Sequence, residues 1–187
     1  MQEKSRLFIA FPVKYSIPLV ECLKELKSAL KHEQIKWVAP ENLHMTLLFL
    51  GDVENSRLDT VCKTMDKSIT GRKGFACEVS GIGVFRDFRN PRVIWMGLSP
   101  VEPFRSLYQS LAPVAELLGI ETGHFKPHIT IGRIRKIYRK DVLKRVVEKY
   151  HDRSLEVFPA DQIILYRSVL RQEGPEYTPV HKVMLGG

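Results

Sequence analysis

Apolar side chains recur along the chain with two different periods, which predict helices and strands in alternation. Spacings of three and four residues are typical of a helix with one buried face. They predict helices over about 17–31, 58–69, 104–118 and 142–150. Short runs of branched and aromatic residues, bounded by proline, glycine or polar residues, predict strands. These runs are 6–11, 44–50, 75–85, 92–98 and 127–134, and the last strands lie within 157–170 and 177–185.

The third predicted helix contains a proline and is followed by a glycine. Pro113 lies inside the helical pattern and predicts a kink, because proline lacks the backbone N–H that the helix needs. Gly119 predicts the C-cap, since glycine readily adopts the left-handed conformation that ends many helices.

The order of the predicted elements repeats coarsely. Each half of the chain has a helix, a connecting segment, a strand that begins near a histidine, and another helix. This repeat predicts an α+β fold of two lobes with a groove between them. Because no linker or low-complexity tract interrupts the pattern, we expect a single domain over residues 1–187.

The tripeptide His-x-Thr occurs twice, each time at the start of a predicted strand. The copies are His44-Met45-Thr46 and His128-Ile129-Thr130. Alternate side chains of a strand point to opposite faces, so each histidine shares a face with its own threonine while the residue between them points into the core. One such pair is ordinary, because threonine is common in strands. Two pairs in matching contexts indicate a site built from two similar halves.

Two histidines can divide acid–base work at a phosphorus atom. One imidazole takes a proton from the attacking water, and the other gives a proton to the departing ribose oxygen on the opposite side. The residues alone do not decide whether His44 or His128 is the acid. The hydroxyls of Thr46 and Thr130 can donate hydrogen bonds to the non-bridging phosphate oxygens.

Arg133 is a candidate phosphate ligand, although its position needs a special backbone. It lies five residues after His128, so an unbroken strand would place it on the opposite face. Gly132 predicts a bulge that turns Arg133 to the histidine's face, where its guanidinium can clamp phosphate. An ordinary surface arginine is the alternative.

The net charge of +8 favours an anionic partner such as RNA, although many basic proteins bind no nucleic acid. The loop 86–92 carries Phe88 and Arg89, which can stack on a base and contact phosphates. The alternative is a solvated hairpin whose aromatic rings fill the core. Tyr138, just past the second His-x-Thr strand, is a further candidate for substrate binding.

Several other classes of function lack their sequence signals. His124 and His128 have the spacing of a helical zinc site, but the intervening Lys126-Pro127 disfavours a helix, so we expect no metal site. The glycine-rich loops that bind ATP or dinucleotides do not occur, and we expect no cofactor. No apolar run approaches the roughly 20 residues that span a bilayer. The absence of a secretory pattern and three irregularly spaced cysteines favour a cytoplasmic protein, and nothing demands more than a monomer.

The residues around both motifs resemble a known family. The two His-x-Thr copies are similar to the signatures of the 2H phosphoesterase superfamily, and within it the chain most resembles the RNA 2′,3′-cyclic phosphodiesterases, also called 2′-5′ RNA ligases. Segment 37–43 before the first motif, segment 125–127 before the second and Gly132-Arg133 after it fit this likeness. The segments 165–170 and 174–177 are similar to the family's last hairpin. The resemblance covers essentially the whole chain.

The resemblance implies two pseudo-symmetric lobes of antiparallel sheet, with outer helices around a central groove and no required metal or cofactor. It implies hydrolysis of a terminal ribonucleoside 2′,3′-cyclic phosphate to a 2′-phosphomonoester, with reversible 2′-5′ ligation as the family's other activity. Carried over, His44 is the proton donor and His128 the proton acceptor, and Thr46 and Thr130 bind phosphate oxygens. The implied partner is an RNA end that carries the cyclic phosphate.

Two alternatives remain open at the level of sequence. The substrate could be another phosphodiester, such as ADP-ribose 1″,2″-cyclic phosphate or a 2′-5′-linked oligonucleotide. The chain could instead bind RNA ends without chemistry, although a pure binder has little need for two titrating groups.

Overall fold

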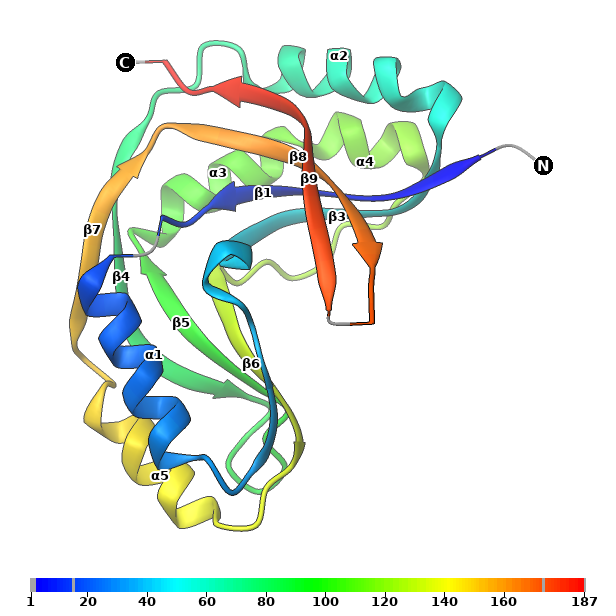
Figure 1. Cartoon of the computed structure of the whole chain (residues 1–187). Helices are drawn as coiled ribbons and strands as arrows, with labels where there is room; N and C mark the ends of the chain where they lie inside the picture. Colours follow the sequence, from blue (N-terminus) through cyan, green and yellow to red (C-terminus); the bar gives the residue numbers. More distant parts are fainter. Residues whose placement is uncertain (1–2, 15, 173, 187) are drawn as a thin grey trace.

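The computed structural model describes residues 3–14, 16–172 and 174–186. Within these residues the chain forms one strongly curled sheet with helices on its outer side, so that the whole has the shape of a C (Figure 1). The strands are β1 (Lys4–Pro12), β2 (Gln34–Trp37), β3 (His44–Glu54), β4 (Phe75–Phe85), β5 (Val93–Ser99), β6 (His128–Lys136), β7 (Ser154–Ala160), β8 (Gln162–Leu170) and β9 (Pro175–Met184). The helices are α1 (Ile17–Ala29), α2 (Leu58–Ile69), α3 (Val101–Ser110), α4 (Ala112–Leu118) and α5 (Lys140–Lys149).

The sheet is antiparallel throughout the described strands and consists of two halves. Its order is β7-β4-β5-β6-β3-β1-β8-β9, and β2 pairs with β6 beyond the start of β3. The halves meet between β3 and β6, where the pairing is a single residue from each strand, Met45 opposite Ile129. This arrangement confirms the expected α+β fold with two antiparallel lobes, and the concave face of the curled sheet corresponds to the expected central groove.

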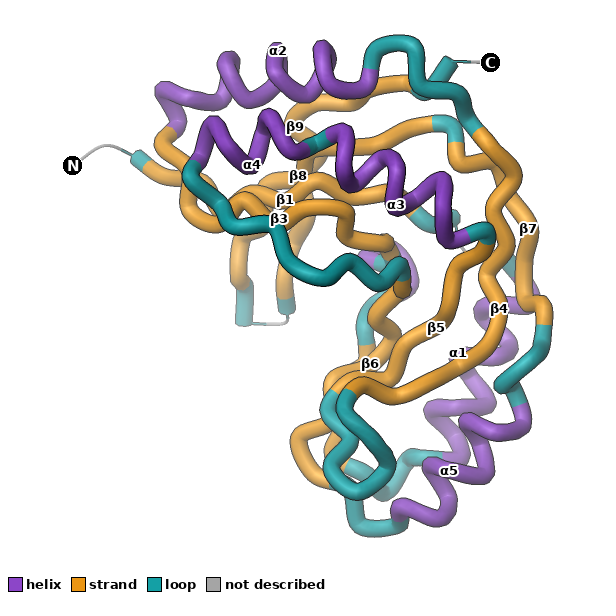
Figure 2. Tube along the Cα trace, turned by 180° about the vertical axis from the view of Figure 1, so that it is seen from behind, coloured by secondary structure: helices purple, strands orange, loops and turns teal. Residues whose placement is uncertain are grey.

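The helices cover the convex side of each half. Helices α2, α3 and α4 pack over the half that contains β3 and β9, whereas α1 and α5 pack over the half that contains β4 and β7 (Figure 2). The core therefore lies between the convex face and the helices, where Met45, Ile129 and Phe104 are fully buried. Burial of the convex face leaves the side chains that alternate with the core, polar and aromatic, on the concave face.

The third predicted helix is two helices in the structure. Helix α3 ends at Ser110 and α4 begins at Ala112, so the expected kink is a complete break at Leu111. Pro113 lies in the first turn of α4, where its missing N–H costs no helical hydrogen bond. Gly119 is the C-cap with φ of 67°, as predicted.

Strand β2 was not predicted. It has only four residues, none of them buried, and the apolar pattern of so short an edge strand is too weak to recognise. Among the described residues, every helix is too short or too polar to cross a membrane.

Candidate active site

The two His-x-Thr motifs lie side by side on the concave face at the junction of the halves. Met45 and Ile129 pair across this junction, and both side chains are completely buried on the convex side. In an antiparallel register centred on this pair, the position of His44 faces that of Thr130, and Thr46 faces His128. The diagonal separation of such positions is about 7–8 Å, which leaves room for one phosphoryl group between two imidazole rings.

Both strands contain a bulge directly after the threonine. Leu47 in β3 and Ile131 in β6 have no partner in the ladder, because the register shifts there. Each bulge puts two consecutive residues on the buried side and moves the next side chain to the concave face. Phe49 and Arg133, each five residues after its histidine, occupy corresponding positions and are exposed.

The bulge in β6 is the one that Gly132 predicted. A Cβ on Gly132 would lie 3.0 Å from Cγ2 of Ile35 and 3.2 Å from the ring of Trp37, so the absence of a side chain lets β2 pack closely. As a result Arg133 lies on the histidine face. Its positive charge contributes to lowering the pKa of both His44 and His128, which places the guanidinium near both rings.

The two histidines are held in the same way. Nδ1 of His44 lies 2.7 Å from the carbonyl oxygen of Asn42, and Nδ1 of His128 lies 2.7 Å from that of Lys126. Since a carbonyl only accepts, each Nδ1 carries a proton and donates it, and in the neutral ring Nε2 is the atom that can accept a further proton. The role of these carbonyls was not predicted from the sequence, although both stand two residues before a motif histidine.

Burial lowers the pKa of both imidazoles below the ordinary value of 6.5. The largest cause for His44 is desolvation, opposed by the hydrogen bond to Asn42 and reinforced by the charges of Arg133 and His128. Desolvation also dominates for His128, with further lowering by Lys126 and Arg133. The influence of His128 on His44 shows that the two rings share one electrostatic environment.

Aromatic rings flank each histidine, and these contacts were not predicted from the sequence. The His44 ring lies 5.0 Å from that of Phe8 and 5.2 Å from that of Tyr177, between centroids. The His128 ring meets Phe85 edge to face at 4.6 Å, and Trp95 stacks on Phe85 at 5.4 Å. The period-two pattern of their strands was the available signal in the sequence. That pattern does not show which rings reach the histidines, because this depends on how the strands pair in the fold.

The remaining candidates lie away from the histidines. Phe88 is partly buried and packs against the core, while Arg89 is exposed and lines a basic pocket at the end of the β4–β5 loop. Tyr138 is 55% exposed, and its hydroxyl accepts a hydrogen bond of 3.2 Å from Nε2 of Gln34. In the described part of the chain, no group of three or more His, Cys, Asp or Glu gathers to hold a metal ion.

Paired imidazoles with adjacent threonines, on the concave face of a curled antiparallel sheet, define the class of two-histidine phosphoesterases. The particular family follows from the comparisons. The chain belongs to the LigT-like phosphoesterases, and the sequence pattern of that family matches residues 11–95. The expected family is therefore confirmed, as is the expectation of an enzyme of the phosphoesterase class.

Relatives match over most of the chain. An RNA 2′,3′-cyclic phosphodiesterase of Aquifex aeolicus is 35% identical over 156 residues, which are 81% of this chain and 82% of that protein. One from Methanocaldococcus jannaschii is 35% identical over 176 residues, 92% of this chain and 96% of that protein. The crystal structure of TT0787 from Thermus thermophilus covers 97% of this chain and 98% of its own, with a TM-score of 0.78 and 29% identity. E. coli LigT shares the fold with a TM-score of 0.74 at 23% identity, with 99% of each chain covered.

Proposed function

We propose that this protein hydrolyses the terminal 2′,3′-cyclic phosphate of RNA to a 2′-phosphomonoester by general acid–base catalysis. The observation that carries the proposal is the symmetric presentation of two imidazoles across the Met45–Ile129 pair, each with Nδ1 bound to a carbonyl and Nε2 available. The relatives named RNA 2′,3′-cyclic phosphodiesterase support the choice of substrate.

In the forward reaction water attacks phosphorus from one side and the ribose 3′ oxygen leaves on the other. Nε2 of His128 takes the proton of the attacking water, and Nε2 of His44 gives its proton to the leaving oxygen. The hydrogen bonds at Nδ1 are equivalent, so this assignment of acid and base rests on the family resemblance. After the reaction His128 carries the proton taken from water, and His44 has lost its own. Proton transfer through solvent returns both imidazoles to their starting states.

Three further side chains stabilise the charge of the phosphoryl group. Thr46 and Thr130 share the face of the histidines and donate to the non-bridging oxygens. Arg133 supplies the positive charge that faces both rings. Ligation to a 2′-5′ linkage is the same chemistry in reverse, with a ribose hydroxyl in place of water.

The test is the kinetics of single histidine variants on a nucleoside 2′,3′-cyclic phosphate, with the product identified as the 2′- or 3′-phosphate. We expect His44→Ala and His128→Ala each to lower kcat by roughly 10²–10⁴. His151→Ala is the matched control, because His151 lies on the surface with 72% of its side chain exposed. Near-normal turnover by both variants, or a 3′-phosphate product, would overturn the proposal. Faster turnover of ADP-ribose 1″,2″-cyclic phosphate or of a 2′-5′ oligonucleotide would reassign the substrate.

We also propose that the protein works in the cytoplasm, as a monomer and a single domain. The three cysteines are free thiols, and Cys22 and Cys77 are buried as small apolar side chains. Their burial is typical of cysteines that pack as small apolar side chains. Size-exclusion chromatography with light scattering checks the monomer.

A further inference from the structure

A strongly basic pocket lies outside the catalytic constellation, at the end of the half that carries His128. Its volume is about 280 Å³, and it opens between the β4–β5 loop and the end of β6. Five of the nine described residues that line it are cationic and none is acidic; the cations are Arg89, Arg92, Arg135, Lys136 and Lys140. Positive charges gathered without an acidic partner repel one another unless an anion binds among them.

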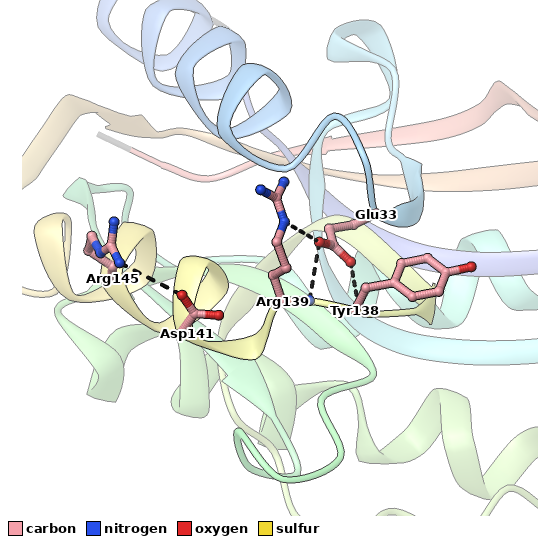
Figure 3. Close-up of polar contacts among 5 residues, drawn as sticks. All are labelled: Glu33, Tyr138, Arg139, Asp141 and Arg145. Carbon is pink, nitrogen blue, oxygen red and sulfur yellow. Dashed lines mark hydrogen bonds and ion pairs between the residues drawn. The ribbon is translucent and has the colours of Figure 1, made fainter.

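The walls of this pocket are held by specific contacts. The buried carboxylate of Glu33, in the turn after α1, accepts hydrogen bonds from the backbone N–H groups of Tyr138 and Arg139, and its Oε1 lies 3.5 Å from Nε of Arg139 (Figure 3). Nζ of Lys140 donates to the carbonyl oxygen of Arg89 and so ties the two walls together. These contacts join the β4–β5 loop, the end of β6 and the turn after α1 within the protein itself.

A line of cations connects the pocket to the histidines along β6. Arg133 and Arg135 are both exposed, with the buried Ile134 between them, so both point to the concave face at a separation of about 7 Å along the strand. Lys36 pairs directly opposite Arg133 on β2 and is exposed. The carbonyl of Arg92 accepts the N–H of Ile134, which holds the β4–β5 loop beside this line.

The half of the sheet that contains β3 has no cation at the position that corresponds to Arg133. The position in β3 that corresponds to Arg133 is Phe49, which is 64% exposed, and the rings of Phe8 and Tyr177 surround His44. The cations that continue from Arg133 along β6 therefore have no counterpart at the matching position of β3. An RNA chain leaves its cyclic end in one direction, because every other phosphate lies on the 5′ side.

We propose that this pocket binds backbone phosphates of the nucleotides that precede the cyclic end, and that the enzyme acts preferentially on oligonucleotide ends. This inference rests on the proposed function and adds a subsite to it. Arginine binds phosphate oxygens through two N–H groups at once, and contact with several phosphates releases the counterions condensed on the RNA. From Arg133 to the pocket the strand advances by only a few residues, so the bound phosphates belong to the nucleotides nearest the cyclic end.

The kinetic test measures kcat/KM for two substrates with the unsubstituted protein and with two double variants. The substrates are a nucleoside 2′,3′-cyclic phosphate and an octanucleotide that ends in the same group. We expect the unsubstituted protein to show a higher kcat/KM for the octanucleotide than for the mononucleotide. In Arg92→Ala/Arg135→Ala the ratio of the two kcat/KM values should fall about tenfold. Lys24→Ala/Lys67→Ala removes the same charge from exposed positions of α1 and α2 and should keep the preference. Equal kcat/KM for both substrates in the natural chain, or equal losses in the two double variants, would overturn the inference.

A binding measurement separates this inference from the proposed reaction. Fluorescence anisotropy with a labelled octanucleotide that ends in a 3′-hydroxyl follows the affinity as salt is raised. Loss of two phosphate contacts should reduce the slope of log K against log salt by about 1.4, since each contact to a single strand contributes about 0.7. A reduced slope without turnover of any cyclic phosphate would support the pocket and reject the reaction. Normal turnover of the cyclic phosphate with an unchanged salt slope would reject phosphate binding in the pocket and leave the proposed reaction standing.

Discussion

Glu33 holds the loop between β6 and α5, and its replacement by glutamine tests how much that contact contributes to the fold. The side chain is fully buried, with 0% exposed. Its two oxygens accept the N–H groups of Tyr138 and Arg139, the latter at 3.3 Å, and Oε1 also faces Nε of Arg139 (Figure 3). Glu33→Gln keeps the size of the side chain but replaces one acceptor oxygen by an NH₂ group, which can only donate.

The loss of unfolding free energy in Glu33→Gln follows from the backbone N–H group that is left without an acceptor. In either orientation of the glutamine amide, at least one buried N–H loses its acceptor, which costs about 1–3 kcal/mol. The ion pair adds less than about 1 kcal/mol, because the Arg139 side chain is 48% exposed and therefore screened by solvent. We expect a total of about 1–4 kcal/mol, or a fall in Tm of about 2–16 °C for a chain of this length.

Thermal and urea unfolding followed by circular dichroism measure the effect. Glu148→Gln is the matched control, because Glu148 is 60% exposed and forms only a surface pair with Lys144, at 3.7 Å. Its loss should cost less than about 1 kcal/mol. Tm values for Glu33→Gln within about 1 °C of the control would refute the reasoning. A second readout is the preference for octanucleotide over mononucleotide, which should fall in Glu33→Gln and stay in Glu148→Gln.

The remaining predictions concern the reaction centre. Because both imidazole pKa values lie below 6.5, kcat/KM should be bell-shaped with its maximum below about pH 6.5; a flat profile from about pH 5 to 8 would contradict it. Arg133→Ala removes a charge that lowers both pKa values, so both limbs should move to higher pH while Arg133→Lys leaves them nearly in place. Thr46→Val should slow the chemical step less than loss of a histidine, as single-turnover kinetics would show. EDTA should leave turnover unchanged, and a loss restored by zinc would point to a metal-dependent reaction.

The same pKa shifts bear on stability. The unfolded chain binds protons to its histidines near pH 6.5, whereas the folded chain binds them only at lower pH. The unfolded state therefore holds more protons in this window, and the free energy of unfolding should decrease as pH falls below about 6.5. Replacing either histidine by glutamine should weaken this dependence, as urea unfolding at a series of pH values would show.

The sequence by itself determined the strands that hold the proposed site and the direction of their side chains. Period-two runs around His44 and His128 fixed the face that each histidine shares with its threonine, because strand geometry leaves no other choice. Gly132 indicated the bulge that turns Arg133 to that face, since a glycine inside a strand often marks a bulge. Pro113 indicated an interruption of the third helix, which the structure shows as a break.

Only the tertiary structure decided which of these parts meet. The pairing of Met45 with Ile129 joins residues far apart in the chain, and local periodicity carries no information about such a partner. The rings that flank the histidines and the contact of Glu33 with Tyr138 also join residues far apart in the chain, whereas the carbonyls that hold the histidines are local. Local sequence sets the direction in which each side chain points, whereas burial of the shared core sets which side chains face one another.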